Sequence, residues 1–357
     1  MSKLAIRHIA FLTPGNYDDA DPRAGLEETL ALFEYGEALG FDSAWVRQRH
    51  LEPGVSSAAT FLAAASQRTS RIGLGTAVIQ MGYENPFRLA EDLSLVDVLS
   101  GGRLNVGLSA GPPPFGKLLG ERFFDADPAA YDFSHARVAR LANNLDGYWL
   151  GDADSRISSA AGEHRPRLRP HAPGLRQRLW YGGGSLRSAR WAAENGFHLL
   201  IGNLNTGEDT DDFFVVQSRH IEAFRSHWRG EGEPKIAVGR VIVPLDSADT
   251  ATRQRYRDYA ESRHERTLAP QGERRTLFTP DLVGTAAEIV ERLQADPILP
   301  LVDMLRLELP YNFAIADYRQ IIADFVALIA PVLGWRGEPL SWKERGRGEV
   351  FGAETVA

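Results

Sequence analysis

Hydrophobic and polar residues along this chain alternate between two patterns. Short apolar runs rich in β-branched residues are followed by segments in which apolar residues recur every three or four positions, the spacing of an amphipathic helix. The apolar runs predict eight strands, at residues 4–13, 43–49, 72–79, 104–110, 179–181, 197–201, 236–243 and 302–309. Short strands that alternate with helices are typical of parallel sheets.

The clearest strand–helix–strand unit spans residues 71–111. Asn85 is suited to cap a helix, and Pro86 follows at the first helical position, where its missing N–H costs nothing. Between the caps, apolar residues recur at helical spacing (Leu89, Leu93 and Val96). Gly101 and Gly102 end the helix directly before the next apolar run. The short connections in this unit predict two neighbouring parallel strands.

Eight strand–helix units that close on themselves form a TIM (β/α)8 barrel, whose ligands lie at the C-terminal ends of the strands. An open doubly wound sheet is the competing α/β architecture, and the number of strands favours the barrel. We expect one domain over residues 1–335 and a polar tail over residues 336–357. Two long segments without a clean period, 112–132 and 267–281, are predicted as inserted loops at the C-terminal face that close over a substrate.

Composition narrows the choice of partners. The 357-residue chain has a formal charge of −7, which argues against nucleic acid or an anionic membrane as the main ligand. It has no cysteine, and no histidine and carboxylate spacing predicts a metal site. No apolar run approaches the roughly 18 residues of a membrane span, and Arg7 and His8 interrupt the N-terminal run. We therefore expect a cytoplasmic protein.

The sharpest local signal is the glycine–serine junction at residues 181–188, Tyr-Gly-Gly-Gly-Ser-Leu-Arg-Ser. Here a predicted strand runs through glycines directly into a helix. Free N–H groups at such a helix start favour a phosphate, and Ser185, Ser188 and Arg187 add hydroxyl groups and charge. The alternative is that the glycines at 182–184 only make a tight turn and that Ser185 is an ordinary cap. The residues alone leave both interpretations open.

The predicted second strand ends at Arg49 and His50, on the face where barrel catalysts lie. A histidine there can donate a hydrogen bond or move a proton near neutral pH. The alternative is that His50 caps the strand or pairs with Glu52.

Two other strands carry small or polar residues toward their predicted ends. Thr76, Ala77 and Val78 suit either simple barrel packing or close approach of a ligand. Asn105 and Ser109 alternate with apolar residues, so one face of their strand is polar and directed inward. Such residues are structural about as often as they are functional.

The chain resembles the bacterial luciferase-like flavin monooxygenases. The resemblance covers nearly the whole chain and is carried by four motifs in a fixed order: Gly75-Thr76, the Asn-Pro-Phe-Arg-Leu-Ala-Glu run at 85–91, the run from Asp97 to Arg103, and the glycine-rich strand at 107–111. It implies a TIM barrel and an enzyme that uses reduced FMN and dioxygen on a small organic substrate.

The resemblance also implies roles for particular residues. In this family the strand-to-helix turn holds the FMN phosphate, which assigns Gly183, Gly184, Ser185, Ser188 and Arg187 to cofactor binding. Small residues of the third strand lie beneath the flavin ring, in some members through a strained peptide bond, which adds Thr76, Ala77 and Val78, with Ser109 beside them. The histidine position makes His50 a catalytic candidate together with Arg49.

Two departures from the family pattern matter. Ala110 stands where some members have a phosphate-binding arginine, and Arg187 is the candidate replacement. Gln48 and Arg49 stand where the family often has Glu-His, which makes an anionic substrate or intermediate met by Arg49 plausible.

The resemblance further implies a separate flavin reductase, since no second nucleotide-binding motif is present, and a homodimer. Two alternatives stay open. The same family includes hydride-transfer enzymes that use the deazaflavin F420, and the missing Glu-His pair allows a flavin-binding subunit without catalysis.

Overall fold

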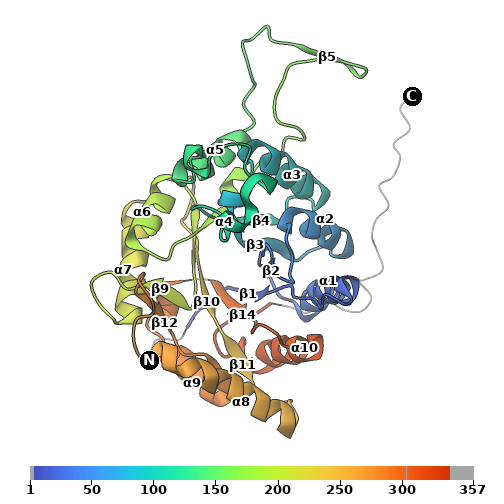
Figure 1. The fold of residues 1–357 in the computed structure, drawn as a ribbon. Helices are drawn as coiled ribbons and strands as arrows, with labels where there is room; N and C mark the ends of the chain where they lie inside the picture. The colour runs from blue at the N-terminus through green and yellow to red at the C-terminus, as the bar shows by residue number, and fades with distance from the viewer. Residues whose placement is uncertain (1–3, 303, 338–357) are drawn as a thin grey trace.

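Eight parallel strands close into a barrel in the computed structural model, which describes residues 4–302 and 304–337 (Figure 1). The barrel strands follow chain order, and the last pairs with the first. They are β1 (His8–Thr13), β2 (Ser43–Val46), β3 (Gly73–Gln80), β4 (Leu104–Ser109), β7 (Leu179–Gly182), β8 (His198–Ile201), β10 (Ile236–Arg240) and β14 (Met304–Glu308). The predicted TIM barrel is confirmed. The predicted polar tail lies, from residue 338 on, outside the described residues.

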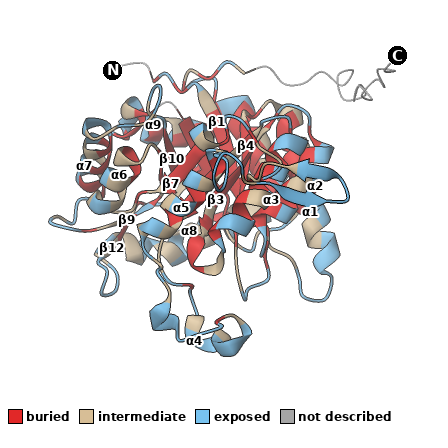
Figure 2. Cartoon of the chain, turned by 90° about the horizontal axis from the view of Figure 1, so that it is seen from above, coloured by how far each residue is buried: buried red, intermediate tan, exposed pale blue. Residues whose placement is uncertain are grey.

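The barrel strands are surrounded by helices that cover their outer surface (Figures 1 and 2). The helices are α1 (Pro22–Leu39), α2 (Ala58–Arg68), α3 (Pro86–Leu99), α5 (His135–Leu145), α6 (Leu186–Glu194), α7 (Phe213–Ser226), α8 (Thr250–His264), α9 (Ala286–Ala295) and α10 (Ile315–Asp324), which continues into a π-helical turn at Phe325–Ile329. Apolar side chains from both layers form the main core. The predicted cap at Asn85 is confirmed, because its side chain accepts hydrogen bonds from the N–H groups of Phe87 and Arg88.

Inside the barrel, a smaller apolar cluster fills the space between the strands. It consists of Ala10, Leu12, Trp45, Ala77, Trp180, Leu200, Ala237 and Met304. The indole rings of Trp45 and Trp180 meet edge to face at 5.7 Å. A Cβ atom on Gly75 would lie 2.1 Å from the Trp45 ring, so only glycine leaves room for it on β3. This packed layer closes the barrel below its C-terminal face.

Two predicted strands end three residues earlier than the apolar runs suggested. The run at 236–243 divides into β10 and β11 (Ile242–Pro244), and β11 leaves the barrel to pair with β13 (Leu282–Gly284). Strand β2 ends at Val46, because the chain then closes a loop in which Arg49 N–H donates to the Val55 carbonyl at 2.8 Å. The residues after Val46 therefore lie in a loop at the mouth of the barrel.

Three additions interrupt the alternation of strands and helices. The short helix α4 (Gly116–Leu119) belongs to a segment that extends away from the barrel at the bottom of Figure 2. A hairpin of β5 (Ile157–Ser159) and β6 (Gly162–His164) projects from the barrel at the top of Figure 1. Strands β9 (Leu204–Thr206) and β12 (Thr276–Phe278) pair with each other near the barrel mouth.

Candidate functional site

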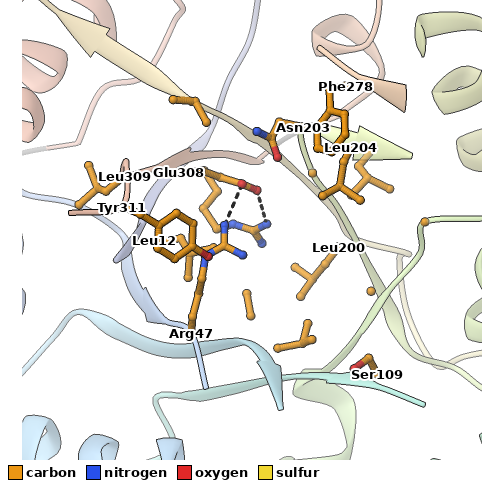
Figure 3. A pocket seen from close by; sticks show the side chains of 18 of the residues that line it. Leu12, Arg47, Ser109, Leu200, Asn203, Leu204, Phe278, Glu308, Leu309 and Tyr311 are labelled. Atoms are coloured by element: carbon orange, nitrogen blue, oxygen red, sulfur yellow. Dashed lines mark hydrogen bonds and ion pairs between the residues drawn. The ribbon is translucent and has the colours of Figure 1, made fainter. Parts of the chain in front are cut away.

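A cavity of about 520 Å³ opens at the C-terminal ends of the barrel strands (Figure 3). Every barrel strand, or the loop directly after it, contributes to its wall. This is the face on which TIM barrels bind ligands, and the volume is in the range of about 300–1,000 Å³ typical of small-molecule sites. The cavity is therefore the candidate site.

Five of the residues predicted to bind a cofactor lie in this wall. They are Ala77, Val78, Ser109, Gly183 and Gly184. The Ala77–Val78 peptide bond is cis, and the pairing of β3 with β4 shifts its register between Thr76 and Ile79. The small-residue segment of β3 and the glycines after β7 thus face one space.

Thr76 has a different environment from its two neighbours. Its side chain is fully buried, its hydroxyl donates to the Gly107 carbonyl at 2.9 Å, and the same oxygen accepts from Gly107 N–H at 3.0 Å. Within the described residues it is not part of the cavity wall. Thr76 ties β3 to β4 and supports the cavity from outside.

The glycine–serine junction forms the start of α6, as the sequence predicted. The Ser185 hydroxyl accepts from Ser188 N–H at 3.2 Å and donates to the Ser188 hydroxyl at 3.1 Å. A Cβ atom on Gly184 would meet nothing within 4 Å, so space is open in front of this turn. Arg187 is exposed in the first turn of the helix. Within the described residues, Ser185, Arg187 and Ser188 are not part of the cavity wall, so their part in binding an anion stays a prediction.

A carboxylate already lies against this helix start, and the sequence reasoning did not find it. Glu208 Oε1 accepts a hydrogen bond from Leu186 N–H at 3.0 Å, while its Oε2 lies 3.3 Å from His220 Nε2. Burial lowers the pKa of His220, although Glu208 acts in the opposite direction. The only sequence signal for Glu208 is a short acidic run between β9 and α7.

Arg49 lies in the cavity wall and contacts Tyr311, which also lines it. The Arg49 guanidinium donates from Nη2 to the Tyr311 hydroxyl and lies 4.8 Å from the centre of the Tyr311 ring. Its Nη1 is 3.5 Å from Glu52, so the partner expected for His50 pairs with Arg49 instead. Arg49 is therefore positioned to meet a ligand.

His50, within the described residues, is not part of the cavity wall. Its ring stacks on Tyr83 at 3.8 Å, and its Nε2 accepts from Gln48 Nε2 at 2.9 Å. Burial lowers the pKa of His50, which favours the neutral ring that this hydrogen bond requires. Gln48 also donates to Glu84 and does line the cavity, so His50 supports Gln48 in this conformation.

Three charged side chains from β14 and the loop after β2 meet inside the barrel mouth. Glu308 accepts from Arg47 Nη2 at 3.0 Å with one oxygen and from Arg306 Nη2 at 3.2 Å with the other (dashed lines in Figure 3). Burial raises the pKa of the Glu308 carboxyl, but attraction to Arg47 and Arg306 outweighs burial and the net shift is downward. Glu308 is thus a carboxylate.

The sequence reasoning missed this charged group. The available signal was the alternation in β14, where Arg306 and Glu308 interrupt an otherwise apolar strand at every second position and so share its inward face.

The two segments predicted as lids differ in position. Phe278, from the segment 267–281, lines the cavity. The segment 112–132 contributes no residue to the wall within the described residues, and its Phe123, Phe124 and Tyr131 form an aromatic cluster with Phe133. Closure of either segment over a substrate stays a prediction.

The described residues contain no group of three or more histidine, aspartate or glutamate side chains placed to hold a metal ion. Among their helices, none has the length and apolar character needed to cross a membrane.

Comparison with known proteins decides the family. The pattern of the family described as luciferase-like monooxygenase matches residues 6–296, most of the chain. The chain belongs to this family. The resemblance noted from the motifs around residues 71–111 is thereby confirmed.

Individual relatives of this luciferase-like chain share only part of it. Limonene 1,2-monooxygenase from Rhodococcus erythropolis is 42% identical over 155 residues, which is 40% of this chain and 39% of that enzyme. The oxygenase component of a flavin-dependent trigonelline monooxygenase from Acinetobacter baylyi is 20% identical over 75% of this chain and 79% of its own length. The chain spans 32% to 48% of the length of the first three curated relatives that it matches.

Solved structures show the same fold. The monooxygenase RslO1 from Streptomyces bottropensis has a TM-score of 0.66 at 19% identity and covers 91% of this luciferase-like chain and 99% of its own. A type II Baeyer–Villiger monooxygenase component from Pseudomonas putida, in complex with FMN, has a TM-score of 0.62 at 14% identity, with coverage of 92% and 98%. An F420-dependent secondary alcohol dehydrogenase has a TM-score of 0.60 at 16% identity, with coverage of 92% and 99%.

Proposed function

We propose that this luciferase-like chain is an FMN-dependent monooxygenase that uses reduced FMN and dioxygen to oxidise a small organic substrate. The main support for the proposal is that two groups of residues, predicted separately to contact the flavin ring and its phosphate, line one cavity. Ala77 and Val78, expected beneath the flavin ring, and Gly183 and Gly184, expected beside its phosphate, line the same space. Membership in the luciferase-like family supports the interpretation of this cavity as a flavin site.

The phosphate is assigned to the start of α6. Gly184 leaves open space in front of the turn, Ser185 and Ser188 offer hydroxyl groups, and the helix start attracts negative charge. Arg187 in the first turn replaces the arginine that some family members have at the position of Ala110. The Ala110 backbone N–H is itself bonded to the Tyr181 hydroxyl at 3.1 Å.

The protein would hold the flavin in place, exclude water from the cavity and supply hydrogen bonds. Bound reduced FMN would supply the electrons that activate dioxygen. Leu12, Ala77 and Leu200 close the cavity from below with apolar surface and exclude water there. Arg49 bonds to the oxygen of the Tyr311 hydroxyl, which leaves the Tyr311 proton free for donation into the cavity.

Two partners belong to the proposal. A relative carries the name of the oxygenase component of a flavin-dependent monooxygenase, which supports a separate reductase as the source of reduced FMN. A homodimer, expected from the family, is supported by an exposed apolar face on α3 that consists of Leu95, Val98 and Leu99. A cytoplasmic location stays part of the proposal.

The F420-dependent dehydrogenase matches the fold with nearly the same TM-score as the FMN-bound oxygenase. The choice of cofactor is therefore the first point to test. The purified protein is titrated anaerobically with FMN, reduced FMN and reduced F420, and binding is followed by flavin or deazaflavin fluorescence. We expect tight binding of reduced FMN and weak binding of F420; the reverse order would overturn the proposal.

Catalysis is tested separately from binding. Oxygen uptake is measured with reduced FMN, with and without a panel of small organic substrates, and oxygenated products are identified by mass spectrometry. A monooxygenase incorporates one atom of dioxygen into product. A protein that binds reduced FMN but turns over no member of the panel would be a flavin-binding subunit instead.

A further inference from the structure

The cavity has two sides of different chemistry. The side formed by β3, β4 and the turn after β7 is lined by small and glycine residues and is the one assigned to the flavin. The other side, formed by the ends of β2 and β14 and by the region of α8, is lined by arginines. These are Arg47, Arg49, Arg263, Arg266 and Arg306; the one carboxylate that the described residues add to the cavity wall is Glu308.

Neighbouring acids neutralise only part of this charge. Asp281 accepts from Arg263 at 2.5 Å and lies 4.0 Å from Arg266, and Glu52 pairs with Arg49. With Glu308 these are three carboxylates for five guanidinium groups among the residues that the structure describes, which leaves two positive charges in excess there. The whole chain is acidic, with a formal charge of −7, so a local positive excess is a specific property of this wall.

The innermost arginines are held by one shared carboxylate. Both oxygens of Glu308 are used, one for Arg47 and one for Arg306. Arg306 is buried, and within the described residues its Nε and Nη1 have no hydrogen-bond partner. A buried guanidinium that shares its counter-ion leaves a positive potential at this point, because little water is available to screen it.

Arg47 belongs to the same charged group, and its guanidinium reaches the cavity surface. Its side chain is 25% exposed and points into the cavity beside Tyr311 (Figure 3). Its Nη2 is bonded to Glu308, whereas no hydrogen bond within the described part of the chain uses its Nη1. The Tyr311 ring lies 5.4 Å from the Arg47 guanidinium and so fixes its orientation from the side.

The neighbouring strand β10 leaves room for this charged group. A Cβ atom on Gly239 of β10 would lie 2.1 Å from Glu308 Oε1 and 3.1 Å from Arg306 Nη2. Glycine at this position therefore accommodates the charged group, which argues that the group is built into the barrel and is not a chance surface contact.

We propose that the substrate of this site is an organic anion, such as a carboxylate, and that its charged group binds to the guanidinium of Arg47 on the arginine-lined side of the cavity. Arg49 and the Tyr311 hydroxyl complete the contact, and Glu308 and Arg306 are positioning residues that hold Arg47. The proposal rests on the proposed function for the statement that the bound anion is a substrate. It does not depend on that function for the statement that the cavity binds anions.

The test compares carboxylates with neutral analogues of the same shape. Benzoate is compared with benzamide, and octanoate with octanamide, in binding to the flavin-free protein followed by tryptophan fluorescence, since Trp45 and Trp180 lie below the cavity. The same pairs are then added to the FMN-loaded protein, and the absorption spectrum of the bound flavin is recorded. We expect at least one carboxylate to bind about tenfold or more tightly than its amide, as charge-assisted hydrogen bonds imply.

Variants assign this preference to Arg47. Arg47→Gln is expected to remove the preference for carboxylate over amide, and Arg47→Lys is expected to retain part of it. In both variants the affinity for FMN should stay within about twofold of wild type. Arg88→Gln, which removes the same charge from the exposed surface of α3, is the matched control. The wild-type comparison needs no variant, so the proposal stays testable if Arg47→Gln does not fold.

The outcomes separate the two proposals. Equal binding of acid and amide in both pairs, absence of binding of either carboxylate, or an Arg47→Gln variant that keeps the preference would contradict the anion site. Loss of FMN binding in the wild-type protein, with the carboxylate preference intact, would contradict the proposed function and leave the anion site standing.

Discussion

Glu208 Oε1 lies 3.0 Å from the backbone N of Leu186, the first residue of α6, and accepts its hydrogen bond. This is the helix start to which we assign the flavin phosphate. A carboxylate and a phosphate compete for the same N–H groups and repel each other. The flavin-free protein therefore holds its own anion where the cofactor is proposed to bind.

Glu208→Gln is expected to tighten FMN binding by about twofold to fivefold, the range that corresponds to one charge near a helix end. Asp209→Asn, a neighbouring change of the same charge at a residue that bonds to Arg219, is the control and should change the affinity less. Both are measured by fluorescence titration. Weaker binding in Glu208→Gln would mean that Glu208 organises the turn for the phosphate.

Gly239→Ala is expected to destabilise the protein by about 1–3 kcal/mol, because its Cβ atom would overlap Glu308 Oε1. Gly184→Ala is the matched control, since its Cβ atom meets nothing within 4 Å. Urea unfolding at neutral pH compares the two. Equal stabilities would show that the Arg47–Glu308–Arg306 group shifts at little cost.

His198, at the start of β8, should make stability depend on pH. Burial, together with nearby Lys235, lowers the pKa of His198 to about 4. The unfolded chain binds a proton near pH 6.5 and the folded chain does so only near 4, so the free energy of unfolding falls as pH drops through this window. The full loss from this residue is about 3 kcal/mol.

The measurement is urea unfolding of wild type and His198→Gln between pH 7 and pH 4. The glutamine does not titrate, so the stability of the variant should fall less steeply than that of wild type. The control is His264→Gln, a change at an exposed position of α8, which should leave the wild-type slope unchanged. If the free energies of unfolding of wild type and His198→Gln fall equally with pH, His198 is not the source of the pH dependence.

An apolar face on α3 predicts the dimer contact. Leu95, Val98 and Leu99 share one side of the helix and are 49%, 50% and 50% exposed. Val98→Glu should convert a dimer to a monomer in light scattering, whereas Leu328→Glu, at an exposed position outside α3, should not. A monomeric wild-type protein would contradict the prediction.

Local signals explain why most of the fold was predictable. In residues 71–111 the cap at Asn85, the apolar spacing and the Gly101-Gly102 stop all lie within a few residues of the structure that they specify. All eight predicted strands therefore occur in the barrel, and errors are confined to their ends. The glycine–serine junction was predictable for the same reason, because a strand, a turn and a helix start follow one another directly.

The missed parts of the site depend on contacts that are distant in sequence. Arg47 and Glu308 are 261 positions apart, and only closure of the barrel by β14 and β1 brings them together. Glu208 reaches α6 because the segment after β9 folds back, where Thr206 N–H bonds to the Gly184 carbonyl. The orientation of His50 depends on how the loop after β2 closes, which no local pattern specifies.

The central claim is that the start of α6 binds the phosphate of FMN, and the affinities of FMN and riboflavin measure it most directly, since riboflavin lacks the phosphate. Gly184→Asp places a negative charge in the open space before the turn, and Gly184→Asn is its neutral control. We predict that wild type and Gly184→Asn bind FMN at least about tenfold more tightly than riboflavin, as charge-assisted hydrogen bonds imply, and that Gly184→Asp loses this difference while remaining folded. Equal affinity of the wild-type protein for FMN and riboflavin, or an undiminished preference in a folded Gly184→Asp protein, would contradict the account.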